Sequence, residues 1–125
     1  MEESSELNAR MVEAARAGDE ETVRCCRNRG ATDFDRGMAA AALGGHSKLM
    51  ALFRLWGATD FDTAMAKAAL CDRADLVRTC YAWGARRTKL AAAWAAVGGS
   101  ERAAKTLEAL EALEATEQNR QFIAV

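Results

Sequence analysis

Small and apolar residues recur along the chain in a fixed order, with 27 residues between equivalent positions. One position holds Met11, Met38, Met65 and Ala92, and another holds Val23, Met50, Val77 and Ala104. Between them lies a pair of alanines, at 14–15, 41–42, 68–69 and 95–96. Apolar residues three or four apart are typical of one face of a helix. The pattern predicts four helix–turn–helix units, at about residues 5–31, 32–58, 59–85 and 86–112.

Two kinds of short segment separate the predicted helices. A glycine follows the alanine pair at Gly18, Gly45 and Gly99, where it suits a helix C-terminus, while Asp72 takes this place in the third unit. The units are joined by Gly-Ala-Thr-Asp-Phe-Asp, at 30–35 and 57–62, with a weaker echo at 83–85. The joint aspartates are expected to accept backbone N–H groups at the start of the next helix. A fixed period of this kind indicates a solenoid, whose units bury their apolar faces against their neighbours.

A longer last helix is expected to close the array. It runs from Glu101 to about Glu117 and carries Leu107, Leu110 and Leu113 on one side. This side either caps the array, as a terminal unit requires, or forms a dimer. The domain then covers residues 1–118, and residues 119–125 are expected to be a flexible tail.

Composition narrows the class of protein. Half of the 125 residues are hydrophobic and none is proline, which favours an all-α fold. The 17 basic and 18 acidic residues argue against nucleic-acid binding. Four cysteines without a CxxC pair and a single histidine predict neither a metal site nor another cofactor. An acidic start and no long apolar run predict no contact with a membrane. Cys26 and Cys80 occupy equivalent repeat positions and are expected to be small core hydrophobes. Buried thiols suggest a reducing, intracellular compartment.

The repeated positions resemble ankyrin repeats. An ankyrin unit places an apolar residue and an Ala-Ala doublet before Gly-His, an apolar second helix and Gly-Ala, and residues 38–58 follow this order with Met38, Gly45-His46 and Gly57-Ala58. The usual ankyrin period is about 33 residues, so each unit here lacks about six. The missing residues would form the β-hairpin finger. The resemblance therefore implies a helical solenoid of about four ankyrin-like repeats without fingers.

Shortened units with a Trp-Gly-Ala-Thr-Asp-Phe joint are similar to the ankyrin-like families of large eukaryotic DNA viruses. This resemblance implies a viral protein in the host cytoplasm that engages a host factor. In ankyrin-like units the residues after the alanine doublet face outward from the concave wall. Here they would place an apolar line along the first helices, bordered by cations and an indole, unless loops or the last helix cover it. The candidate partner-binding residues are Arg36, Leu43, Lys67, Leu70, Trp94 and Val97.

Other conspicuous side chains are expected to be structural. Trp56 and Trp83 precede Gly-Ala and can pack on Phe34 or Phe61 of the joints. His46 is expected to bond local backbone, and no residue is placed to form a catalytic triad with it. The sequence thus predicts a non-enzymatic protein–protein interaction module, as a monomer or weak homodimer. The alternative is a structural virion or assembly protein that self-associates.

Overall fold

The computed structural model describes residues 3–123, with side chains described through residue 120. Within this range the chain forms eight α-helices and no strand, which confirms the all-α prediction. The helices are α1 (Ser4–Ala17), α2 (Glu20–Asn28), α3 (Phe34–Gly44), α4 (Ser47–Leu55), α5 (Phe61–Leu70), α6 (Ala74–Trp83), α7 (Thr88–Gly98) and α8 (Glu101–Ile123).

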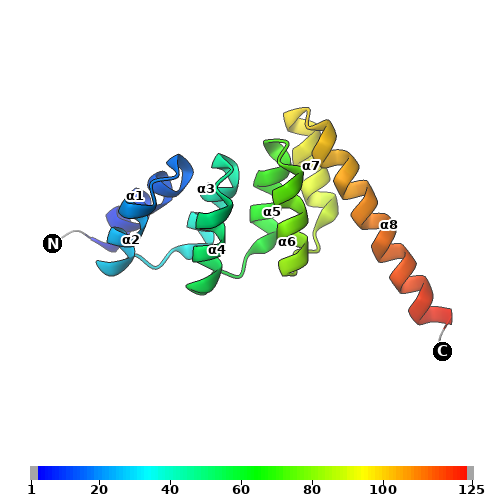
Figure 1. Cartoon of the computed structure of the whole chain (residues 1–125), viewed down its shortest axis with the longest axis horizontal. Helices are drawn as coiled ribbons and strands as arrows, with labels where there is room; N and C mark the ends of the chain where they lie inside the picture. Colours follow the sequence, from blue (N-terminus) through cyan, green and yellow to red (C-terminus); the bar gives the residue numbers. More distant parts are fainter. Residues whose placement is uncertain (1–2, 124–125) are drawn as a thin grey trace.

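The helices follow one another along the molecule as four pairs, each joined by a short turn (Figure 1). The first helices of the pairs, α1, α3, α5 and α7, pack side by side in one row. The second helices α2, α4 and α6 each pack on the first helix of their own pair. The last helix, α8, packs on α7 and also contacts α6 and α5. The row of first helices is therefore the continuous wall of the molecule.

The turn inside each pair has the same backbone geometry. Gly18, Gly45 and Gly99 have φ angles of 81°, 80° and 65°, and Asp72 takes the same left-handed conformation with a φ of 57°. Aspartate is one of the few residues other than glycine that adopt this conformation readily. The residue after each of these four donates its backbone N–H to the carbonyl of the first alanine in the pair, as Arg73 does to Ala68 at 2.9 Å. The substitution of aspartate for glycine therefore leaves the turn intact.

The core lies between the two helices of each pair and between successive pairs. Met11, Met38 and Met65 are fully buried, and burial of each such side chain contributes about 1.5–3 kcal/mol. Their equivalent in the last pair is Ala92, which is partly exposed. No further pair packs on that side in the described range, so a larger side chain would gain little there. Cys80 is also fully buried, in agreement with its predicted role as a small core hydrophobe.

Aromatic residues close the other end of the second and third pairs. The ring of Phe34, at the start of α3, lies 5.8 Å from that of Trp56, which follows α4. Phe61 and Trp83 repeat this contact at 5.8 Å in the next pair. The guanidinium of Arg27, from the preceding pair, lies 4.6 Å from the centre of the Trp56 ring. These contacts confirm that the two tryptophans have a structural role.

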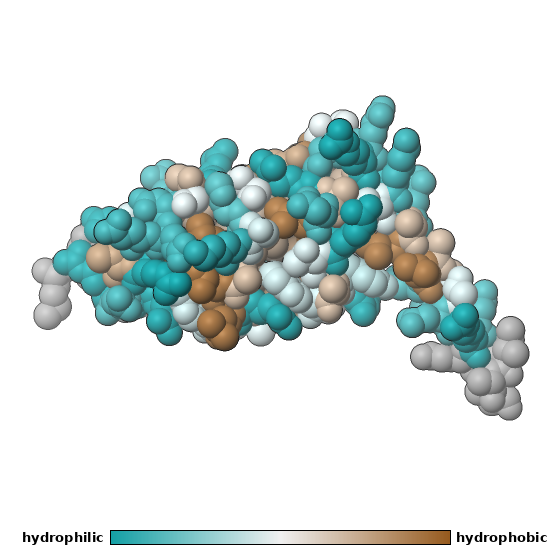
Figure 2. Space-filling view, in the orientation of Figure 1, coloured by the Kyte–Doolittle hydropathy of each residue, from teal (hydrophilic) through white to brown (hydrophobic). Residues whose placement is uncertain are grey.

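The last helix is more than twice as long as α2, α4 or α6, with 23 residues. Leu107 and Leu110 are buried on this helix, whereas Leu113 is 61% exposed. The C-terminal end of α8 extends away from the pairs (Figure 1). Apolar surface is visible midway along this helix (Figure 2). The helix includes residues 119–123, where the sequence predicted a flexible tail, because no glycine or proline stops it. Residues 124–125 of that predicted tail lie outside the described residues.

Candidate partner-binding face

Polar side chains near the starts of the first helices hold each following pair in place. The amide oxygen of Asn8 accepts the backbone N–H groups of Thr32 and Asp33, at 2.9 and 3.1 Å. The carboxylate of Asp35 accepts those of Thr59 and Asp60, at 2.8 and 3.0 Å. These bonds fix the spacing between successive first helices. The prediction that the joint aspartates cap their own helices thus holds for Asp60, which accepts the N–H of Thr63, but Asp35 bonds the next joint instead.

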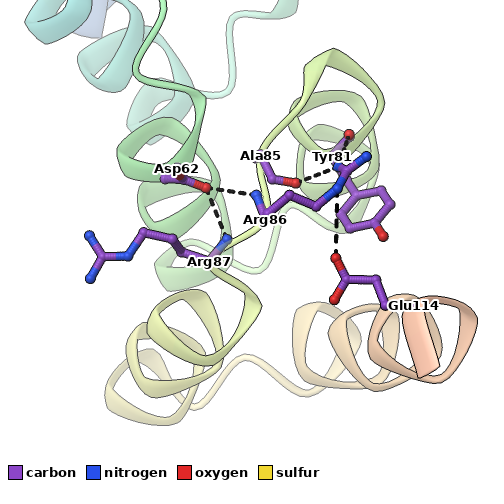
Figure 3. A network of polar contacts seen from close by, with 6 residues as sticks. All are labelled: Asp62, Tyr81, Ala85, Arg86, Arg87 and Glu114. Carbon is purple, nitrogen blue, oxygen red and sulfur yellow. Dashed lines mark hydrogen bonds and ion pairs between the residues drawn. The ribbon is translucent and has the colours of Figure 1, made fainter. Parts of the chain in front are cut away.

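Asp62 makes a third contact of this kind, and this contact belongs to a larger network (Figure 3). Asp62 accepts the backbone N–H groups of Arg86 and Arg87, at 2.8 and 2.9 Å. The Arg86 side chain donates to the carbonyls of Tyr81 and Ala85, and its Nε lies 3.7 Å from a carboxylate oxygen of Glu114. The network therefore joins α5, the end of α6 and the joint before α7 to α8.

His46 contacts backbone, but the carbonyl belongs to the preceding pair and is not the local one that the sequence predicts. Its Nε2 lies 3.1 Å from the carbonyl oxygen of Arg16. Ser100 occupies the equivalent position in the last pair and donates its hydroxyl to the carbonyl of Leu70 at 3.0 Å. Both side chains thereby hold the C-terminus of an earlier first helix.

The first helices α1, α3 and α5 form one open groove of about 360 Å³ on the wall. Its floor is apolar and its rim carries cations and carboxylates. Three of the six residues predicted from the sequence line this groove, namely Arg36, Leu43 and Lys67. The others lining it are Val12, Arg16, Asp35, Ala39, Ala40, Asp60 and Thr63.

The charges on the rim are not equivalent. Both carboxylates already hold backbone N–H groups, Asp35 from the next joint and Asp60 at the start of α5. Both carboxylates are nevertheless exposed, as are Arg16 and Arg36, whereas Lys67 is partly buried. Arg36 makes an ion pair with Asp33 at 3.2 Å but its side chain remains 67% exposed. Lys67 places its ammonium 4.6 Å from the centre of the Trp94 ring. The groove therefore presents charges of both signs to a partner, with three cations and two carboxylates beside its apolar residues.

The other three predicted residues continue the wall beyond the groove. Trp94 is partly buried on α7 and adjoins the groove through its contact with Lys67. Leu70 is also partly buried, at the end of α5. Val97 is 78% exposed on α7. The predicted apolar line thus consists of two partly covered leucines and one open valine.

Sequence reasoning missed the small residues of the floor. Val12 and Ala39 stand 27 residues apart at equivalent positions, and Ala39 lies one helical turn before Leu43. This spacing places them on one face of the wall. The signal was present in the periodic pattern, but alanine at a buried position and alanine on a groove floor look alike in a sequence.

The thiol of Cys80 is buried and is not a reactive nucleophile. Burial raises its pKa from 9.0 to about 12, with a smaller contribution from the nearby carboxylate of Asp62. A thiol with this pKa is almost entirely protonated at neutral pH, so it is a poor nucleophile.

Among the residues that the structure describes, no group of three potential metal ligands is close enough to hold an ion. No helix in the described range is long and apolar enough to cross a membrane.

Comparison with protein-family models, with curated proteins and with solved structures found no significant match.

Proposed function

We propose that the chain is a non-enzymatic protein–protein interaction module that binds its partner on the wall of first helices. The observation that carries this proposal is the groove on α1, α3 and α5, with an apolar floor and exposed cations on its rim. Concave sites with an apolar floor and a few polar groups are the usual form of a binding site. The partner would be a host factor, met in the host cytoplasm by a viral protein.

The recurrence of contacts at 27 residues supports an ankyrin-like solenoid as the scaffold. The bonds from Asn8, Asp35 and Asp62 follow this spacing, as do the four left-handed turns. In such an array each unit contacts mainly its neighbours, and the stacked units create an extended surface. A rigid row of helices also lowers the entropy that binding would otherwise cost.

The charge on the groove indicates the partner's chemistry. A segment with one or two apolar side chains would fill the floor beside Leu43, and a neighbouring carboxylate would meet Arg36 or Lys67. Each exposed charge pair adds only about 0.2–1 kcal/mol, so the apolar contact would supply most of the affinity and the cations the orientation. An apolar segment flanked by acidic residues is therefore the expected ligand.

The alternative is a structural virion or assembly protein that self-associates. The exposed Leu113 on α8 favours this second function. The two functions use different surfaces, so variants can separate them.

An affinity capture from host-type cell lysate tests the proposed function. The bait is the full chain, compared with a Leu43→Glu/Lys67→Glu double variant whose fold is verified by circular dichroism. A Leu55→Glu variant is the matched control, since Leu55 is exposed on α4, outside the groove. A partner retained by the native chain and the control but lost by the double variant would support the proposal. Equal recovery by all three would refute the groove as its binding site.

A further inference from the structure

The last pair of helices leaves open the side on which each earlier pair is covered by the next one. The second residue of the alanine pair is fully buried in the three earlier pairs, at Ala15, Ala42 and Ala69. Its equivalent on α7, Ala96, is exposed. Ala93 is exposed as well, whereas Ala39 and Ala66 are buried at the same position of α3 and α5. We call this open side of α7, centred on Ala93 and Ala96, the end face; it lies outside the groove of the proposed function.

The start of α7 carries the opposite charge to the starts of α3 and α5. Arg87 and Lys89 stand 27 residues after Asp60 and Asp62. Because Asp62 bonds the next joint, the position of Lys89 faces the side on which a following pair would lie. Positive charge is unfavourable at a helix N-terminus, and α7 has no acidic residue in its first turn. A carboxylate from another molecule would therefore be favourable beside Lys89.

A carboxylate lies near the other end of the same face. Glu101 begins α8, and its equivalent three periods earlier, Glu20, lies 3.1 Å from the ammonium of Lys48 in the following pair. The position of Glu101 therefore also faces the open side. Lys89 and Glu101 are both exposed, and neither forms an ion pair with another described residue. The end face thus carries an unpaired cation at one end and an unpaired carboxylate at the other.

We propose that the end face packs on the end face of a second copy of the chain, with the two α7 helices antiparallel across a two-fold axis. Lys89 and Glu101 are centred on residue 95, and Ala93 and Ala96 are centred between residues 94 and 95. An axis at this point places Ala93 against Ala96 of the second copy, and Lys89 beside its Glu101. Arg87 adds positive charge near the same carboxylate. Small side chains at the centre let the two helices approach closely.

The remaining charges on the end face do not oppose this contact. Lys105 and Glu108 stand three periods after Arg24 and Arg27, whose guanidinium groups lie over the ring of Trp56 in the following pair. These two positions therefore face the open side as well. Their charges have opposite signs, as do those of the first two positions. The four charges sum to zero, so two end faces do not repel each other.

Head-to-tail stacking of copies is disfavoured at both ends of the row. Lys89 cannot accept the backbone N–H groups that Asp35 and Asp62 accept from the following joint. At the other end, Arg10 is exposed where the later first helices have small buried residues, at Gly37, Ala64 and Ala91. A second copy that stacked by its α1 would have to bury this arginine. The two-fold contact requires neither change, and it closes on itself, so association stops at a dimer.

The dimer is expected to be weak. The contact centres on one helix of each copy, so it buries less than the roughly 800 Å² per partner of a standard stable interface. We therefore expect a dissociation constant on the order of 10–100 µM.

Sedimentation velocity of the full chain over a range of concentrations tests the proposal. The mean mass should rise from that of one chain towards that of two and stop there. Ala96→Arg should abolish the rise, because it places a bulky cation in the contact, close to Lys89 of the second copy. Ala82→Arg is the matched control, since Ala82 is an exposed alanine on α6, outside the end face. Leu113→Lys tests the exposed side of α8, and neither it nor Ala82→Arg should change the association.

Charge reversal tests the two-fold pairing itself. In a dimer of Lys89→Glu chains, or of Glu101→Lys chains, both charge contacts join like charges, so the dissociation constant should rise about tenfold. An equimolar mixture of these two variants restores opposite charges at both contacts. The mixture should therefore form one-to-one dimers with about the native dissociation constant. Circular dichroism verifies that every variant is folded.

A mixture that associates no more tightly than its two components would overturn the proposal. So would a native chain that stays monomeric to about 1 mM, far above the expected dissociation constant. Growth beyond a dimer, or loss of association in Ala82→Arg, would contradict a closed contact at the end face. Loss of association in Leu113→Lys would move the contact to α8 and overturn the proposal as well.

Discussion

Asp62 and Arg86 are 24 residues apart in the sequence, yet the carboxylate of Asp62 accepts the backbone N–H of Arg86 at 2.8 Å. The same carboxylate accepts the N–H of Arg87 at 2.9 Å. Asp35 makes the equivalent pair of bonds one period earlier. One side chain per pair therefore determines where the next first helix begins, and with it the shape of the wall.

Removal of this side chain should weaken the connection between pairs. Asp35→Ala and Asp62→Ala each delete two hydrogen bonds to backbone, and each should lower the free energy of unfolding by about 1–2 kcal/mol. Asparagine should restore most of the loss, because Asn8 makes the same bonds at the first joint. Urea denaturation followed by circular dichroism measures both. Equal losses for alanine and asparagine would contradict this role.

Close approach of α1 and α3 depends on the absence of a side chain at Gly44. A Cβ atom at Gly44 would lie 2.2 Å from the carbonyl oxygen of Arg16, and backbone cannot move aside cheaply. Gly44→Ala should therefore destabilise the fold by about 3 kcal/mol, at the upper end of overpacking effects.

The matched control for Gly44 is the equivalent position in the first pair, which already holds Ala17. No pair precedes it in the described structure, so Ala17→Gly should cost only about 0.5–1 kcal/mol, the usual difference between the two residues. Thermal unfolding of both variants provides the comparison. Similar small effects would show that α1 and α3 adjust freely.

Arg86 should hold the middle of α8 against the rest of the molecule. Arg86→Ala removes the bonds to the Tyr81 and Ala85 carbonyls and the ion pair with Glu114. Hydrogen exchange in residues 108–118 should become about fivefold faster, since exposed contacts of this kind contribute on the order of 1 kcal/mol.

Arg87→Ala is the control for this exchange experiment. Only the backbone of Arg87 takes part in the network of Figure 3, so its side chain can be removed without breaking a bond drawn there. Exchange in residues 108–118 should remain at the native rate. Faster exchange throughout the chain in Arg86→Ala would instead indicate a global loss of stability.

Alkaline pH should destabilise the fold through Cys80. Burial raises the pKa of this thiol from 9.0 to about 12, so the native state keeps a proton that the unfolded chain releases. The contribution is fully present below pH 9.0 and is lost as the pH rises towards 12. The free energy of unfolding should fall by at most about 1.4 kcal/mol per pH unit in this interval.

Comparison with Cys80→Val isolates the thiol from other groups that titrate at alkaline pH. The difference in unfolding free energy between the two proteins, measured from pH 8 to 10.5, should grow above pH 9. Thiol labelling at pH 8 gives an independent reading: Cys71 is exposed and should react quickly, whereas Cys80 should react only when the chain unfolds. A pH-independent difference would contradict the assignment.

The repeated positions could be recognised in the sequence because equivalent side chains in successive pairs have nearly the same surroundings. Met38 and Met65 fill equivalent sites, so the same residue recurs after 27 positions. The alignment even identified Asp72 as the counterpart of the turn glycines, which its left-handed backbone bears out. The tryptophans of the joints and the two core cysteines were assigned correctly for the same reason.

Contacts between one pair and the next were harder to predict from the repeated pattern. The aspartates of the joint look like ordinary helix caps, and only the positions of successive helices show that Asp35 reaches forward to the next joint. The candidate site divides in the same way: Arg36, Leu43 and Lys67 were predicted and line one groove, whereas its alanine floor was not. The identity of a small apolar residue does not indicate whether a neighbouring helix covers it or it faces solvent.

The sequence by itself determined the helices, their turns and their order, because local spacing and backbone preference act over a few residues. Only the tertiary structure decided what those helices leave uncovered. Leu107 and Leu113 belong to one periodic run on α8, yet the first is buried and the second is 61% exposed. Their six-residue spacing places the two side chains about 120° apart around the helix, and the packing of α8 on α5, α6 and α7 decides which of the two is covered.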